Sequence, residues 1–141
     1  MARGLRVRRP GVVLGLGDAA TIVLFVALGL AGHDEGITPG GIARTAVPIL
    51  VAWFAVAPVA GTYRRPGLRS LAVTWLPAVV AGVLVRSAIV GHPTGWALVT
   101  FAGVALGVTL VMLVAWRMVA TLLLRTPRPP EPSRRAGAEA A

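Results

Sequence analysis

Four long apolar runs dominate this chain, and each is long enough to cross a lipid bilayer as one helix. They cover about residues 12–31, 45–63, 71–90 and 96–124 of the 141 residues. A bilayer core about 30 Å thick needs about 20 apolar residues in helical conformation. A helix also forms the hydrogen bonds of its backbone N–H and C=O groups internally, and this is necessary because lipid tails offer no hydrogen-bond partners. The sequence therefore predicts an all-α membrane protein with four transmembrane helices.

The composition agrees with this class. Hydrophobic residues make up 56% of the chain, whereas soluble domains have about 45–50% apolar residues. All fourteen basic residues are arginines, and the net charge is +9. Because these arginines flank the apolar runs instead of forming one soluble face, we expect no nucleic-acid partner. The absence of cysteine excludes disulfides, a thiolate nucleophile and a cysteine-ligated metal.

The arginines also predict an orientation. They gather before the first run, between the second and third runs, and after the fourth, whereas the other two connections contain only Arg44. Positive residues favour the cytoplasmic side, so both termini should be cytoplasmic in a protein of the cell membrane. We expect residues 1–11 to be a basic cytoplasmic segment, 12–124 the transmembrane domain and 125–141 a disordered cytoplasmic tail. The same arginines should attract anionic lipid headgroups.

Helical spacing places small and polar residues together on one face of the first, third and fourth runs. We expect these faces to point inward, because small residues let helices approach closely and lipid rejects polar groups. The glycines expected to pack between helices are Gly11, Gly15, Gly29, Gly82, Gly103 and Gly107.

The fourth run shows the pattern most clearly. Gly103 and Gly107 form a small-xxx-small motif, which leaves open a contact within the bundle or between two protomers. The remaining residues of that expected inward face are Trp96, Thr100, Leu110, Val114, Arg117 and Thr121. Trp116 falls on the other side, near the cytoplasmic boundary, where an indole suits the membrane interface.

Three ionisable residues, Asp18, Arg86 and Arg117, lie inside the predicted spans. Such residues usually face the bundle and find partners there. At 1.5 Å per residue, Asp18 lies roughly 9 Å from the cytoplasmic start of its helix, and Arg117 lies at a similar depth. We therefore predict that these two residues pair. Arg86 lies near the outer end, close to the expected level of His33, Asp34 and Glu35 (residues 33–35), although either arginine could instead extend to the headgroups.

The only two histidines occupy similar stretches, "GHDEG" and "GHPTG". Glycines just after apolar helices are ordinary helix-ending residues, so we interpret the pair as two similar turns. His33 shares a helix face with Asp18, whereas His92 does not, and only His33 is kept as a candidate functional residue. Two histidines alone make a poor metal site, so no metal and no cofactor are predicted.

The segments "GDAATIVLFVALGLAGHDEG", "RTAVP", "GVLVR", "GWALVTF" and "AWR" together resemble the DUF3054 family of small four-helix membrane proteins. The resemblance covers nearly all of residues 18–117 and includes Asp18, His33, Arg86 and Arg117. The chain departs from the family pattern at Leu30, Val47 and Ile49. The resemblance implies a membrane location and four helices, and it implies no activity.

Three functions remain open. The leading hypothesis is a structural or accessory bundle that acts with a partner, because it requires only the small-residue faces and the internal ion pair. The alternative is a small dimeric proton- or ion-coupled transporter that uses Asp18. The second alternative is a membrane protein that binds a cofactor through His33. No HExxH, CxxCH or P-loop motif is present and no catalytic residue is identified, so the sequence favours a protein that is not an enzyme.

Overall fold

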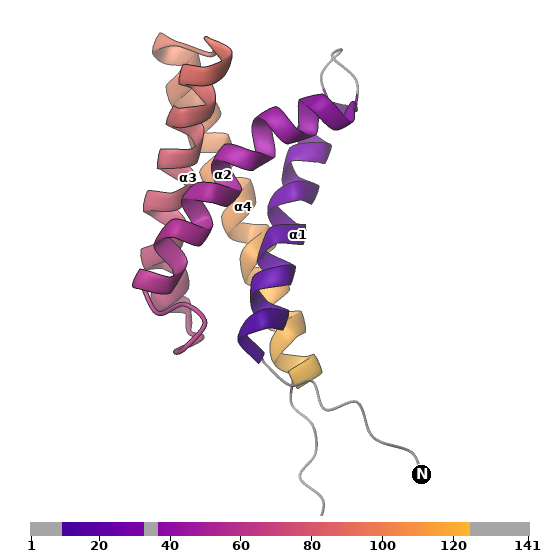
Figure 1. Ribbon diagram of the computed structural model, residues 1–141, viewed down its shortest axis with the longest axis vertical. Helices are drawn as coiled ribbons and strands as arrows, with labels where there is room; N and C mark the ends of the chain where they lie inside the picture. Colours follow the sequence, from indigo (N-terminus) through magenta and orange to yellow (C-terminus); the bar gives the residue numbers. More distant parts are fainter. Residues whose placement is uncertain (1–9, 33–36, 125–141) are drawn as a thin grey trace, which may run out of the picture.

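The computed structural model of the chain describes residues 10–32 and 37–124, and the regular elements of this part are all α-helices (Figure 1). They are α1 (Pro10–Ala31), α2 (Pro39–Val59), α3 (Leu68–Val90) and α4 (Gly95–Leu124). Each helix is long and apolar enough to cross a membrane. The predicted all-α architecture, with four helices long and apolar enough to span a membrane, is therefore confirmed. Most of the predicted N-terminal segment and the whole predicted tail lie outside the described residues.

Helix α2 begins and ends earlier in the chain than the apolar run predicted as the second span. Helix α2 begins at Pro39 because Thr38 caps it, its hydroxyl accepting a hydrogen bond from the Gly41 amide at 3.1 Å. Proline suits the first helical position, where no amide hydrogen is needed. The helix ends at Val59, and the chain then turns through Gly61 with a φ of 69°. Capping and turn residues set these ends, whereas hydropathy alone had placed them at residues 45 and 63.

The helices form a ring in which consecutive helices are neighbours and α4 packs back against α1. Figure 1 shows α2 crossing obliquely in front of the bundle. At the lower end in that view, α1 begins beside the end of α4, and we call this the termini end. Towards the opposite end α4 runs beside α3 and away from α1, and we call this the cavity end for reasons given below.

Large side chains fill the space between the helices, and other large apolar side chains cover the outside. Trp53 of α2 is completely buried, as are Ile22 of α1 and Leu113 of α4. By contrast, Val111 and Leu122 on the outer face of α4 are 70% and 68% exposed. In water such a surface would be costly, but it is the surface that lipid tails accept.

Gly82 allows α2 and α3 to approach closely. A Cβ atom built on Gly82 would lie 2.6 Å from the Cα atom of Ile49 in α2, which is closer than real atoms come. Polar contacts add to the packing, since the Trp75 indole of α3 donates to the Thr109 hydroxyl of α4 at 3.2 Å. The third span therefore packs through the face that contains Gly82, as its pattern predicts.

The expected inward face of the fourth span is only partly present in the structure, because Arg117 faces the bundle whereas most of the other residues of that face are exposed. A contact of Gly103 and Gly107 with a second protomer stays a prediction. The buried residues of α4 are Ala105, Thr109, Leu113 and Ala120, whereas Trp96 is 81% exposed. Gly103 and Gly107 are exposed, and a Cβ atom on either would meet nothing within 4 Å in the described part of the chain. Two of the four buried residues are thus alanines. The buried Thr109 hydroxyl donates a hydrogen bond to the Ala105 carbonyl of the same helix.

We predict that Gly82→Ala destabilises the bundle, because its new methyl group would collide with the α2 backbone. Overpacking of this kind costs about 1–3 kcal/mol. Thermal or denaturant unfolding of the purified protein in a mild detergent measures the effect. The matched control is Gly103→Ala, which meets open space and should be neutral or gain up to about 1 kcal/mol from helix propensity. Equal stability of the two variants would contradict the close approach.

Candidate functional site

An ion pair joins α1 to α4 inside the bundle. The Nη2 atom of Arg117 donates to the Oδ2 atom of Asp18 at 2.6 Å, and the Asp18 side chain has no exposed surface. Arg117 is nearly as well covered, with 11% of its side chain exposed. The pairing predicted from helix depth is therefore present, between residues 99 positions apart in the sequence.

Aromatic side chains surround this pair. Trp53 of α2, Tyr63 of the turn after α2 and Trp116 of α4 lie close to it. The Trp53 indole donates to the Tyr63 hydroxyl at 3.0 Å. The Arg117 guanidinium lies 5.9 Å from the centre of the Tyr63 ring, within the range of a cation–π contact.

Trp116 does not lie at the lipid side, so that prediction was wrong. Its indole packs directly over Gly17 of α1, where an added Cβ atom would lie 1.8 Å from the Trp116 ring. Gly17 was not among the packing glycines expected from the sequence. A pattern of small residues predicts contact between two helix backbones, whereas here an aromatic ring covers the glycine.

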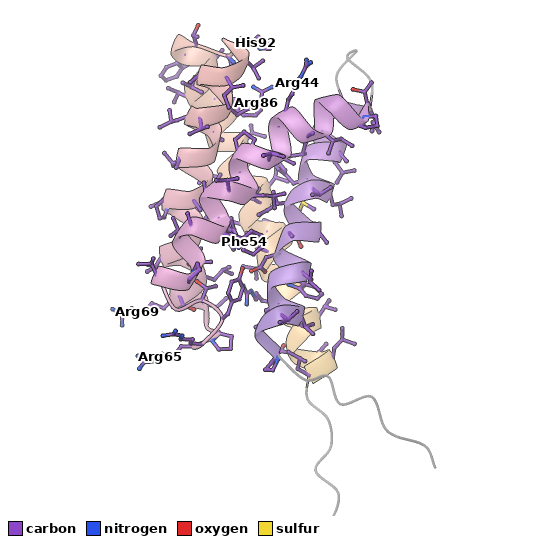
Figure 2. All side chains as sticks on the ribbon, in the orientation of Figure 1. Arg44, Phe54, Arg65, Arg69, Arg86 and His92 are labelled. Carbon is purple, nitrogen blue, oxygen red and sulfur yellow. The ribbon has the colours of Figure 1, made fainter. Side chains whose placement is uncertain are left out.

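The termini-end face of α1 is covered by the turn after α2. A Cβ atom on Gly11 would lie 3.4 Å from the Tyr63 Cβ atom, and one on Gly15 would lie 3.7 Å from both the Tyr63 and the Phe54 rings. Figure 2 labels Phe54 midway along the bundle, on the side of α2 nearest α1. The glycines thus make room for Tyr63, which reaches Trp53 and the ion pair.

The ion pair leaves several buried polar atoms without a partner in the described part of the chain. They are the Oδ1 atom of Asp18, the Nε1 atom of Trp116, and the Nε and Nη1 atoms of Arg117. A buried polar atom normally finds a partner or an ordered water molecule. The pair therefore joins the helices through one direct hydrogen bond and retains unused hydrogen-bonding capacity.

A cavity of about 720 Å³ lies at the opposite end of the bundle. All four helices contribute to its wall, together with the short connection between α3 and α4. Its lining is mainly apolar, with the hydroxyls of Thr45 and Thr100 and the side chain of Arg86 as the polar groups of the helices. Small residues such as Gly29 and Ala97 line it where larger side chains would fill it.

Arg86 is the cationic group of this cavity. Its guanidinium lies 5.0 Å from the centre of the Phe101 ring of α4, and its Nη1 atom donates to the His92 carbonyl at 3.1 Å. The neighbouring Ser87 hydroxyl donates to the Pro93 carbonyl at 2.5 Å. Two adjacent side chains from the end of α3 thus hold the connection against the cavity (Figure 2).

His92 has a place in the structure that the sequence-based interpretation did not give it. His92, which that interpretation set aside, lies in the cavity wall and accepts a hydrogen bond from Arg86 through its carbonyl. His33, Asp34 and Glu35, the expected neighbours of Arg86, lie outside the described residues. The role of His92 depends on its backbone, so side-chain chemistry gave no signal for it.

Gly29 also differs from its expected role. It is exposed, and a Cβ atom there would meet nothing within 4 Å in the described segments. It therefore lines the cavity and does not pack against another helix. Within residues 10–32 and 37–124 no group of three histidine, cysteine, aspartate or glutamate side chains could hold a metal ion.

We predict strong coupling between Asp18 and Arg117. Removing one member of a buried ion pair costs about 3–5 kcal/mol, because the other charge stays buried without a partner. Asp18→Asn and Arg117→Gln should each lower the free energy of unfolding by such an amount, and the double variant should lose less than the sum by at least about 1 kcal/mol. Unfolding of the four proteins in detergent gives the cycle. Arg65→Gln, an exposed arginine at the same end, is the control, and additive effects at residues 18 and 117 would refute the pairing.

A second prediction concerns Gly17. Gly17→Ala should destabilise the protein by about 1–3 kcal/mol, because the methyl group occupies the space of the Trp116 indole. The cost should shrink when the same change is made in a Trp116→Leu background, since the smaller side chain can move aside. The same unfolding assay measures both costs. An equal cost in the two backgrounds would mean that the indole does not lie over Gly17.

Comparison with known proteins gives the family but no activity. No curated protein and no solved structure shows significant similarity to the chain. The sequence profile of a family described as "Protein of unknown function (DUF3054)" matches residues 15–120. This match includes the ion pair and the wall of the cavity. The chain therefore belongs to the DUF3054 family.

Proposed function

We propose that this chain is a membrane protein whose bundle binds an apolar or amphiphilic small molecule in the cavity between its four helices. The observation that carries the proposal is the cavity itself. Its volume of about 720 Å³ falls within the range of roughly 300–1,000 Å³ that is typical of small-molecule sites. Its mainly apolar wall with a few polar groups is also typical of such sites.

The contrast between the two ends of the bundle supports this function. At the termini end, Trp53, Tyr63 and Trp116 fill the space around the ion pair. At the cavity end, Gly29 and Ala97 leave space unfilled. An apolar cavity of this size is a place where an apolar ligand gains more than water does.

The same bundle suggests an orientation in the cell membrane. Arg65 and Arg69 lie at the termini end (Figure 2), and the other arginine groups of the sequence precede α1 and follow α4. The proposed topology places this end at the cytoplasmic face, where its charges meet anionic headgroups. The cavity then lies in the outer half of the membrane.

The two leading sequence-based hypotheses fit the geometry less directly. Ion coupling through Asp18 would require the carboxylate to act on a transported molecule, but Asp18 is bound to Arg117 at the end away from the cavity. An accessory role with a partner subunit, or a homodimer, is compatible with the exposed apolar faces but makes no use of the cavity. Ligand binding is therefore the function that the geometry supports best.

A test of this function fills the cavity with a side chain. Gly29→Leu and Ala97→Leu add bulk from α1 and from α4, and both positions are exposed, so the change should not disturb the core. Each should weaken binding of a fluorescent apolar probe to the purified protein by about tenfold or more, because overfilling a site costs about 1–3 kcal/mol. Gly103→Leu is the matched control, since this glycine is equally open but lies outside the cavity. Unchanged binding in both cavity variants, or an equal loss in Gly103→Leu, would overturn the proposal.

A further inference from the structure

We infer that the ligand of this cavity is an anionic amphiphile, with an oxyanion that binds Arg86 and an apolar chain that fills the space between α1 and α4. This inference rests on the proposed function and adds the chemical class of the ligand. A fatty-acid carboxylate and a lipid phosphate share this chemistry, so the experiment below includes both.

The position of the charge is the first argument. Arg86 lies in the last turns of α3 and is half-buried. Its stacking on Phe101 and its hydrogen bond to the His92 carbonyl hold the guanidinium against the cavity wall. Arginine is well suited to this task, because its planar donors match the geometry of carboxylate and phosphate groups.

The unpaired donor of Arg86 is the second argument. Its Nε atom is buried and has no hydrogen-bond partner within residues 10–32 and 37–124. A cation within the apolar region of a membrane is costly unless an anion accompanies it. An anionic headgroup would supply both the charge and an acceptor.

The rest of the wall is the third argument. Away from Arg86 the cavity is bounded by Phe25, Val26 and Leu30 of α1 and by Val104 and Ala105 of α4. These side chains suit an acyl chain and offer nothing to a small free anion. The geometry thus pairs one cationic group with a long apolar wall, which is the complement of an amphiphile and not of inorganic phosphate.

The experiment compares ligands that share one acyl chain but differ in the charge and type of their headgroup, with inorganic phosphate as the anion that lacks a chain. Full-length protein in a neutral detergent is titrated with oleate, with lysophosphatidic acid of the same chain length, with neutral monoolein and with inorganic phosphate, and binding is followed by native mass spectrometry. Oleate and lysophosphatidic acid should bind tighter than monoolein by roughly tenfold to a hundredfold, the usual effect of a hydrogen bond to a charged group. Inorganic phosphate should not bind measurably.

Three arginine variants locate the source of this preference. Arg86→Gln should reduce binding of both anionic ligands to the level of monoolein and leave monoolein itself unchanged. Arg44→Gln removes the same charge from the same end of the bundle (Figure 2), but Arg44 is exposed and does not line the cavity. This control should keep the full preference. Arg86→Lys should keep part of it, because the charge remains while the planar donors are lost.

The outcomes separate this inference from the function on which it rests. Equal affinity for oleate and monoolein in the unmodified protein would overturn the inference, as would an anion preference that survives in Arg86→Gln or disappears in Arg44→Gln. Measurable binding of inorganic phosphate would also overturn it. In each of these cases Gly29→Leu would still weaken monoolein binding if the proposed function is correct. Only monoolein binding that is insensitive to Gly29→Leu and Ala97→Leu would refute the cavity as a binding site.

Discussion

The ion pair between Asp18 and Arg117 is the contact on which the arrangement of the four helices depends. Apolar helices in lipid have little to fix their rotation or their register, because one apolar face is nearly as acceptable to lipid as another. A buried carboxylate is different, since it must meet its partner or remain at high free energy. The 2.6 Å contact therefore sets the depth and rotation of α1 against α4 and closes the ring of helices.

The structure around this contact follows from it. Gly17 admits the Trp116 indole beside the pair, and Gly11 and Gly15 admit Tyr63 from the turn after α2. The termini end is thereby filled with large aromatic groups. At the other end α1 and α4 separate, and the walls between them are lined mainly by apolar side chains and by one arginine. One end holds the helices together, and the other borders the half-open space that we propose for a ligand.

Much of the fold, but only part of the candidate site, could be predicted from the sequence. The four helices and the ion pair followed from hydropathy and depth, since both reflect the thickness of the membrane. The packing face of α4 did not, because Gly103 and Gly107 are small without being in contact, while Ala105 and Ala120 make the contacts. A small residue shows only that a close approach is possible.

The cavity was harder still to predict. It arises from the divergence of α1 and α4, and no single segment encodes that divergence. His92 contributes through a backbone carbonyl, and Gly29 contributes through the absence of a side chain. Neither leaves a pattern in the sequence. The start of α2, by contrast, was readable from Thr38 and Pro39, and hydropathy alone overlooked it.

The most direct test of this account is to observe the ion pair in a lipid bilayer. The chain contains two aspartates, Asp18 and Asp34. In an Asp34→Asn protein, solid-state NMR therefore detects one aspartate side-chain carboxyl carbon, that of Asp18. We predict a through-space contact between the Asp18 carboxyl carbon and an arginine guanidinium nitrogen, and we expect Arg117→Gln to abolish it while Arg86→Gln leaves it intact. An Asp18 carboxyl with no guanidinium contact, or one whose contact survives Arg117→Gln, would contradict the account.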